Sequence, residues 1–186
     1  MDSSSALAVA IKTRRLVQFV RKFESRGDHL IGVPIAVGRV WVVLARIDDR
    51  IAPGGFDALR QSDIAEVRDT FKGRTFYIRG LRARRSSVAA LPNLDLDSTA
   101  GLLRSVSQFY SLLVLSCEGL SPDTVDIGVL LKASRESCSL RLISSNAQWV
   151  RGRSAYRNTD ITRVGFGGEY EETLAAVARL SDPKWK

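Results

Sequence analysis

The chain carries few side chains of the kinds that catalyse reactions. His29 is its single histidine, and Cys117 and Cys138 are its two cysteines. A lone histidine in a turn is more often a solvated side chain than a general base. Both cysteines lie in apolar, strand-like runs, which is typical of small core residues. Since no nucleophile, base and orienting group come together, we expect a protein that is not an enzyme.

A metal or cofactor is not expected either. One histidine and two cysteines in predicted strands fit no spacing of zinc ligands. The glycine-rich residues 165–168 precede a predicted helix, where backbone N–H groups could cradle a phosphate. However, Glu169, Glu171 and Glu172 occupy the start of that helix, suit its dipole and would repel phosphate. Two cysteines are too few for a disulfide framework and fit a reducing, cytoplasmic environment.

Clusters of basic side chains give the strongest functional signal. The candidate nucleic-acid-binding residues are Lys12, Arg14, Arg15, Lys72, Arg74, Arg79, Arg82, Arg84 and Arg85. Phe71, Phe76 and Tyr77 are interleaved with the second group. Basic residues beside exposed aromatic rings can follow a phosphate backbone and stack on bases. Alternatively, the rings pack a helix onto the core and the arginines only face water, which the spacing of Phe76, Tyr77 and Leu81 favours.

The elements that would position these residues repeat along the chain. The recurring positions in the first copy are Ile31, Gly32, Val33, Arg39, Leu44, Ile47, Arg60, Asp63, Ile64 and Val67. Their counterparts are Ile127, Gly128, Val129, Arg135, Leu140, Ile143, Arg157, Asp160, Ile161 and Val164, with one residue inserted between Ile143 and Arg157. Such self-similarity predicts two copies of one supersecondary unit.

Hydrophobic alternation predicts about five short antiparallel strands and flanking helices in each copy. Strands are expected at residues 16–23, 32–37, 40–47, 56–60 and 64–68, then at 109–118, 126–133, 137–143, 155–157 and 161–166. Helices are expected at residues 6–11 and 69–85, from the N-cap Ser98 onward, and after residue 167 with Leu174, Ala175 and Val177 facing inward. Asp63 and Asp160 are expected to cap turns, and residues 86–97 to link the copies.

This order of elements resembles the Sm-like fold, and residues 159–174 resemble the end of an uncharacterised group of bacterial tandem Sm-like proteins. The resemblance implies a mainly β (α+β) protein of two tandem five-stranded Sm-like or SH3-like antiparallel barrels with short flanking helices. One barrel would span residues 1–88 and the other residues 97–186.

The Sm-like family binds single-stranded RNA through two loops, one with an Asp and an Asn, the other with an Arg/Lys-Gly pair. The first loop here reads Val37-Gly38-Arg39 and Ala133-Ser134-Arg135, and the second falls at residues 60–63 and 157–160. The arginines are kept, but the glycine and the paired Asp and Asn are absent. The resemblance therefore implies the barrel without the family's RNA pocket.

Charge divides unevenly between the copies. The chain has a net charge of +8, with 17 Lys/Arg against 10 Asp/Glu in residues 1–96 and 11 against 10 in residues 97–186. A basic half suggests a polyanionic partner, although such charge also serves solubility alone. Since the segment after the first copy is basic and its counterpart, residues 169–179, begins acidic, the copies could also dock or self-associate through complementary charge.

These patterns predict a non-enzymatic binding or scaffolding protein, with RNA binding through the basic N-terminal half as its candidate activity. The alternative is a protein–protein interaction or structural module with no nucleic-acid role. Candidate partners are single-stranded nucleic acid, an acidic protein and a second copy of the chain. The sequence contains no signal peptide and no apolar run long enough for a membrane helix, so we expect a cytoplasmic protein without membrane contact.

Overall fold

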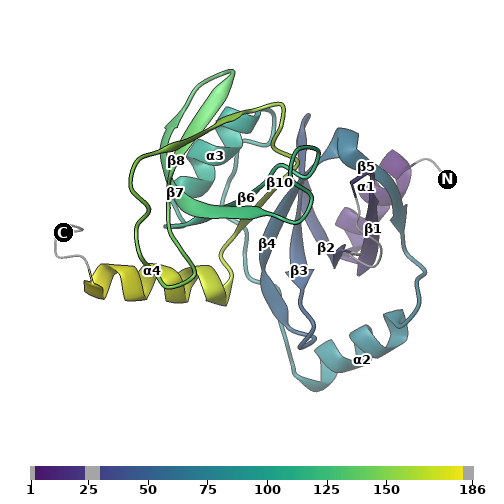
Figure 1. Cartoon of the computed structure of the whole chain (residues 1–186). Helices are drawn as coiled ribbons and strands as arrows, with labels where there is room; N and C mark the ends of the chain where they lie inside the picture. Colours follow the sequence, from purple (N-terminus) through teal and green to yellow (C-terminus); the bar gives the residue numbers. More distant parts are fainter. Residues whose placement is uncertain (1–2, 24–29, 182–186) are drawn as a thin grey trace.

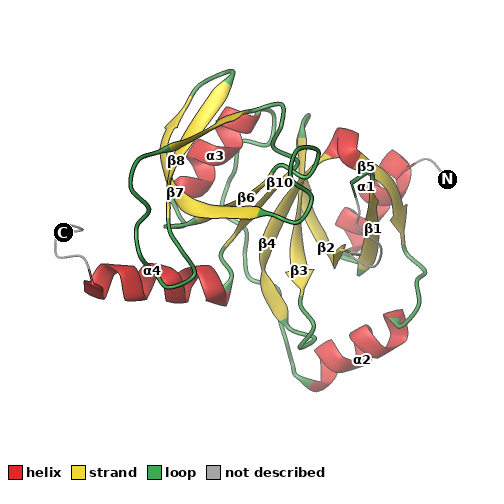
Figure 2. Ribbon diagram, viewed as in Figure 1, coloured by secondary structure: helices red, strands yellow, loops and turns green. Residues whose placement is uncertain are grey.

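The computed structural model describes residues 3–23 and 30–181. Within them the protein is mainly β, with ten antiparallel strands in one sheet and four short α-helices (Figures 1 and 2). This confirms the predicted mainly β, α+β class. The strands of the first half are β1 (Val17–Arg21), β2 (Leu30–Val37), β3 (Trp41–Ile47), β4 (Pro53–Arg60) and β5 (Ile64–Arg68). Those of the second half are β6 (Leu113–Ser116), β7 (Val125–Ala133), β8 (Ser137–Leu142), β9 (Ser154–Arg157) and β10 (Arg163–Phe166).

The helices lie around this sheet. They are α1 (Ser3–Thr13), α2 (Arg74–Ala83), α3 (Thr99–Ser107) and α4 (Glu169–Ser181), and a 3₁₀ turn, η1 (Gln61–Asp63), separates β4 from β5. Ser98 caps α3 as predicted, because its hydroxyl accepts a hydrogen bond from the backbone N–H of Gly101. The predicted helix over residues 69–85 is shorter in the structure. Gly73 takes a left-handed conformation just before α2, and Arg85 does so just after it.

The strand order is β5-β1-β2-β3-β4-β10-β6-β7-β8-β9. We expected two separate sheets, each closing on itself as a barrel, but the hydrogen bonds join the halves into one sheet. β4 pairs with β10, from Leu59 opposite Arg163 to Phe56 opposite Phe166. The pairing has a physical reason, because an unpaired β4 would expose both its apolar side chains and its backbone groups at a sheet edge.

Both halves nevertheless share one strand order and one register. The order β5-β1-β2-β3-β4 recurs as β10-β6-β7-β8-β9. Gly32 lies opposite Arg46, and 96 residues later at both positions Gly128 lies opposite Leu142. Beyond the inserted residue between β8 and β9 the offset becomes 97 residues. The repeat inferred from residue types is therefore also a repeat of hydrogen bonding.

The glycine that recurs in β2 and β7 has a steric cause. A Cβ atom at Gly32 would lie 2.5 Å from the carbonyl oxygen of Ala45, and one at Gly128 would lie 2.4 Å from that of Arg141. The neighbouring strand approaches too closely for any side chain at either position. A glycine is therefore required at the same place in each copy.

The main hydrophobic core extends across both halves. Trp41 and Val43 of β3 belong to the same buried cluster as Leu102 and Leu103 of α3 and Leu140 of β8. Residues 86–97, which were predicted to link the copies, pack against the core. Leu96 is buried in this cluster, and its carbonyl oxygen accepts hydrogen bonds from the backbone of residues 40 and 41. The chain between the copies is thus part of the packed structure.

The terminal helix and the turn aspartates differ from the prediction in detail. Leu174 of α4 is buried as expected, but Val177 is exposed and Ala178 takes the inward position. Asp63 and Asp160 do lie in turns, where each accepts a hydrogen bond from the hydroxyl of the preceding residue rather than the expected backbone N–H. Among the described helices, none is long and apolar enough to cross a bilayer.

The shared core predicts that the halves unfold together. Leu140→Ala in β8 should lower the free energy of unfolding by about 2–5 kcal/mol, because it removes a fully buried side chain. Leu131→Ala in β7 should change it by less than about 0.5 kcal/mol, since Leu131 is exposed. Urea denaturation followed by circular dichroism checks both variants. A Leu140→Ala protein that unfolds in two separate steps would contradict one shared core.

Candidate functional site

Two regions carry the polar chemistry of the described chain: the basic surface of the first half and the junction between the halves. Of the nine predicted nucleic-acid-binding residues, all except Arg74 are exposed. Lys12 lies in the last turn of α1, and Arg14 and Arg15 lie in the loop that follows it. Lys72, Arg84 and Arg85 flank α2, while Arg74, Arg79 and Arg82 lie within the helix.

The sides of α2 differ in what they contact. Tyr77, Ile78 and Leu81 pack against a buried cluster that includes Leu16 of the first half. Phe76 instead keeps 66% of its surface exposed. Phe76 and Arg79 lie three residues apart in the helix and are exposed, and Lys72, just before the helix, is exposed as well. The prediction that the aromatic rings pack on the core is thus confirmed for Phe71 and Tyr77 and wrong for Phe76.

The segment that carries these cations lies between Asp69 and Asp95 and has no acidic residue of its own. Residues 70–94 contain six Lys/Arg and no Asp or Glu. In the described part of the chain none of these six cations forms a salt bridge, and Arg74 donates to the carbonyl oxygen of Leu16 at 3.4 Å. We call Lys72, Phe76, Arg79 and Arg82 the α2 basic face. Its positive charge is not compensated within the described structure.

The two predicted basic clusters meet at the loop between α1 and β1. Arg74 binds the carbonyl oxygen of Leu16, which follows Arg14 and Arg15 directly. Arg14 also lines a hollow of about 400 Å³ together with residues 87–91, just after Arg84 and Arg85. Arg15 lies 3.9 Å from Asp69, but both side chains are more than half exposed. The structure therefore brings the clusters close together, with one acidic side chain between them.

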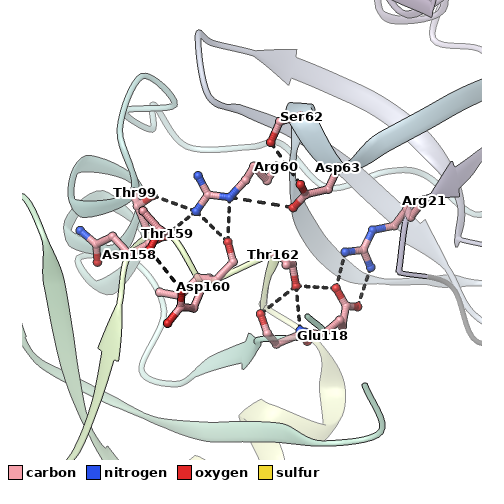
Figure 3. A network of polar contacts seen from close by, with 12 residues as sticks. Arg21, Arg60, Ser62, Asp63, Thr99, Glu118, Asn158, Thr159, Asp160 and Thr162 are labelled. Carbon is pink, nitrogen blue, oxygen red and sulfur yellow. Dashed lines mark hydrogen bonds and ion pairs between the residues drawn. The ribbon is translucent and has the colours of Figure 1, made fainter. Parts of the chain in front are cut away.

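The junction between the halves contains a buried ion pair. Both terminal nitrogens of Arg21 in β1 donate to the carboxylate of Glu118, which follows β6 (Figure 3). The Thr162 hydroxyl donates to the same carboxylate at 2.5 Å, and its oxygen accepts the backbone N–H of Glu118. Arg21 and Glu118 expose only 4% and 10% of their side chains. This network connects strands that are far apart in the sequence.

The environment of Glu118 favours its charged form. Burial by itself would raise the pKa of Glu118, but the hydrogen bonds from Arg21 and Thr162 and the charges of Arg21 and Arg163 outweigh it. The net effect lowers the pKa of Glu118 below its ordinary value. Glu118 is therefore held as a carboxylate that neutralises Arg21.

Arg60, at the end of β4, is the second contact between the halves. Its guanidinium donates to the carbonyl oxygens of Ile161 at 2.7 Å and Asn158 at 2.5 Å (Figure 3). It also lies over the Trp41 ring, 4.7 Å from the centroid, and 3.9 Å from Asp63. The pKa of Arg60 is lowered on balance, because the effect of burial exceeds the opposing effect of the Asp63 and Asp160 charges.

A third charged group, Asp57 of β4, lies fully buried beside the seam. Its carboxylate oxygens lie 3.6 Å from Arg46 and 3.7 Å from Arg163 of β10. Buried charges of this kind need opposite charges nearby, and here one partner comes from each half. The junction chemistry thus serves to hold the halves in register.

The two cysteines considered from the sequence are held as thiols. Cys138 is buried and Cys117 half-buried, and burial raises the pKa of each thiol to about 11. Both are therefore protonated and weakly nucleophilic at neutral pH. His29 lies outside the described residues. Glu169 contacts Arg50 at 2.9 Å and not α2, so the predicted pairing of the basic and acidic segments is not formed in this part of the structure.

Sequence reasoning missed the junction. The repeat did not point to this junction, because the copies differ there. The positions equivalent to Arg21, Glu118 and Thr162 in the other copy are Cys117, Lys22 and Ala65. That difference was itself a signal. A polar residue that occurs in only one copy indicates a contact that the other copy does not make. Compared with models of protein families, with curated proteins and with solved structures, the chain gives no match.

Removal of one partner from the buried ion pair should destabilise the fold. Glu118→Ala is expected to lower the free energy of unfolding by about 3–5 kcal/mol, because Arg21 would remain buried without a counter-charge. The double variant Arg21→Met with Glu118→Leu should recover most of this loss. Glu66→Ala is the control, since the Glu66–Arg68 pair is largely exposed and should contribute at most about 1 kcal/mol. Chemical denaturation of the wild type and these three variants measures the free energies of unfolding.

The same pair predicts a dependence on pH. Because the folded state lowers the pKa of Glu118, its stabilising effect is present above the unfolded pKa near 4.5 and is lost as the pH falls through the folded pKa. The stability difference between the wild type and Glu118→Gln should therefore be constant near neutral pH and shrink below about pH 4. A difference that grows on acidification would contradict this assignment.

Proposed function

We propose that this protein is a non-enzymatic binding or scaffolding protein that holds single-stranded nucleic acid on its basic N-terminal half. The observation that carries the proposal is the α2 basic face, where an exposed aromatic ring and exposed cations that form no salt bridge within the described structure lie on one short segment. Cations neutralise phosphates, and an exposed ring provides a surface on which a base can stack. The loop of Arg14 and Arg15 extends this surface toward α1.

The proposal includes an Sm-like, barrel-type origin for each half, on residues 1–88 and 97–186. The identical strand order and register of the two halves support it. Two arginines of the first copy correspond to the family's RNA-contacting loops, and Arg39 of these is exposed and lies 3.4 Å from Asp97. Arg60 is engaged by carbonyl oxygens of the second half, and the Gln61 amide donates to Gly38. We therefore assign the nucleic acid to α2 rather than to these loops.

Cellular location forms part of the proposal. Two free cysteines and the absence of a disulfide among the described residues support a reducing compartment, and we assign the protein to the cytoplasm. The polyanion could also be an acidic protein, as the same cations would attract carboxylates. Only a nucleic acid, however, offers flat bases to Phe76, which is why it is preferred.

Binding to single-stranded RNA and DNA at two salt concentrations tests this function. Affinity should fall steeply as salt rises, because each neutralised phosphate releases bound counterions. Arg79→Glu with Arg82→Glu should weaken binding at low salt and reduce the slope of log K against log salt by about 1.4. Lys132→Glu with Arg135→Glu is the matched control, because both residues are exposed in the second half. Equal effects of the two double variants, or no binding at low salt, would overturn the proposal.

A single aromatic substitution separates nucleic acid from an acidic polypeptide. Phe76→Ala should weaken single-stranded nucleic-acid binding by about 1–3 kcal/mol, while Phe76→Trp should preserve it, since stacking needs an aromatic face. Because Phe76 is 66% exposed, neither change should alter the unfolding midpoint much. Binding of polyglutamate should be insensitive to both substitutions. If Phe76→Ala weakened the binding of polyglutamate and left nucleic-acid binding unchanged, the acidic-protein alternative would be favoured.

A further inference from the structure

An apolar hollow of about 400 Å³ lies between α1, β2 and the connection that follows α2. Its walls include Ile11 of α1, Val33 and Ile35 of β2, and Val88 and Leu91 of the connection. Three hydrophobic clusters meet there, because Ile11, Val33 and Leu91 each belong to a different one. Sites for small molecules have volumes of this order and are lined mainly by apolar side chains with a few polar groups. The hollow therefore has the size and lining of a ligand site.

Arg14 supplies a positive charge to the lining of this hollow. Its side chain is exposed, and among the described residues it forms no salt bridge. The wall opposite α1 belongs to the segment of residues 70–94, which contains no acidic residue, and Arg84 and Arg85 lie just before that wall. A guanidinium without a counter-charge binds anionic groups through charge-assisted hydrogen bonds. The polar end of the hollow is therefore suited to an anion.

The backbone at Arg14 is unusual for an arginine. Arg14 follows α1 with a φ of 47°, and the N–H groups of Arg14 and Arg15 donate to the carbonyl oxygens of Ile11 and Ala10. This is a Schellman helix end, in which glycine usually occupies the left-handed position. Arg85 has the same geometry after α2, where the connection that forms one wall of the hollow begins. The helix ends would favour glycine at both places, so they do not account for the two cations.

The second copy does not repeat this arrangement in the part that the structure describes. The unpaired residue of the strand bulge is Ile35 in β2 and Leu131 in β7. Ile35 is half-buried at the hollow, whereas Leu131 is 52% exposed. The residue 96 positions after Arg14 is Tyr110, whose ring centroid lies 5.1 Å from that of Phe166. The hollow and its cation are thus features of the first copy that the repeated fold does not require.

We propose that the hollow binds a single-chain amphiphile with one anionic head group, of which a fatty-acid carboxylate is the simplest example. The head group pairs with Arg14, and the apolar chain lies between the side chains of α1, β2 and the connection. A nucleic-acid base fits this lining less well, because apolar walls would leave the polar edges of the base without hydrogen-bond partners. The site is separate from the α2 basic face and does not depend on nucleic-acid binding.

Titration calorimetry with octanoate, decanoate and dodecanoate, each below its micelle concentration, tests the apolar part of the site. Affinity should rise about fourfold with each added methylene until the chain fills the hollow, because each buried methylene contributes a similar free energy. Ile35→Trp should fill the hollow and abolish binding. Leu131→Trp, at the equivalent position of the second copy, is the matched control and should have little effect. Affinity that does not depend on chain length would contradict the proposal.

Arg14→Gly tests the contact with the head group and leaves the fold intact. Because glycine is preferred at this helix end, the unfolding midpoint should stay the same or rise. Decanoate should bind about tenfold to a hundredfold more weakly, since a charged hydrogen bond is lost, while decanol should bind as it does to the wild type. Arg135→Gly removes an exposed charge from the second half and should change neither affinity. Equal binding of decanoate and decanol by the wild type would refute the role of Arg14.

Two further measurements separate this site from other surfaces that attract anions. Arg79→Glu with Arg82→Glu should leave decanoate binding nearly unchanged at physiological salt, because these residues belong to the α2 basic face. Vesicles of phosphatidylglycerol offer anionic head groups and acyl chains as a membrane surface. Binding to these vesicles without binding to monomeric decanoate, or no binding of any of the three carboxylates, overturns the proposal.

Discussion

The requirement that backbone groups at a sheet edge find partners governs this structure. β4 carries apolar side chains on both faces, and pairing with β10 covers them and its backbone at once. The shared core, the Arg60 contacts and the buried ion pairs all lie around that seam. Two copies of one unit thereby become a single sheet, whose halves are fixed relative to each other by hydrogen bonds as well as by side chains.

Buried charges determine which strand edges pair at the seam. A hydrophobic seam between similar repeats would tolerate alternative pairings, because the strands of one copy resemble those of the other. The Arg21–Glu118 pair connects β1 to the end of β6, and Asp57 of β4 lies between Arg46 of β3 and Arg163 of β10. Any other pairing would leave at least one charge buried without a partner, which costs several kcal/mol. Polar residues thus specify which edges join within the chain, and the uncompensated charge of α2 remains outside, on the surface.

Local patterns predicted the strands well and the contacts between them poorly. Apolar alternation placed β2, β3 and β7 within two residues of their observed bounds, and Ser98 was identified as an N-cap from its type and position. The joining of β4 to β10 could not be read from either strand, because it depends on which edge the fold leaves open. Phe76 and Tyr77 illustrate the same limit for the candidate site. Adjacent residues on a helix point about 100° apart, and only the packing of α2 shows which ring faces water.

The single residue inserted between β8 and β9 separates an offset of 96 from one of 97 without changing any pairing. The connection after Leu142 therefore contains the extra residue, and the alignment of the paired strands is unchanged. The extra residue lies in a connection outside the ladders, which itself buries Ile143 and Ala147 against α4. A fluorescent label, an affinity tag or a whole domain introduced at the exposed residues 150–153 of this connection would consequently leave the seam in its present geometry.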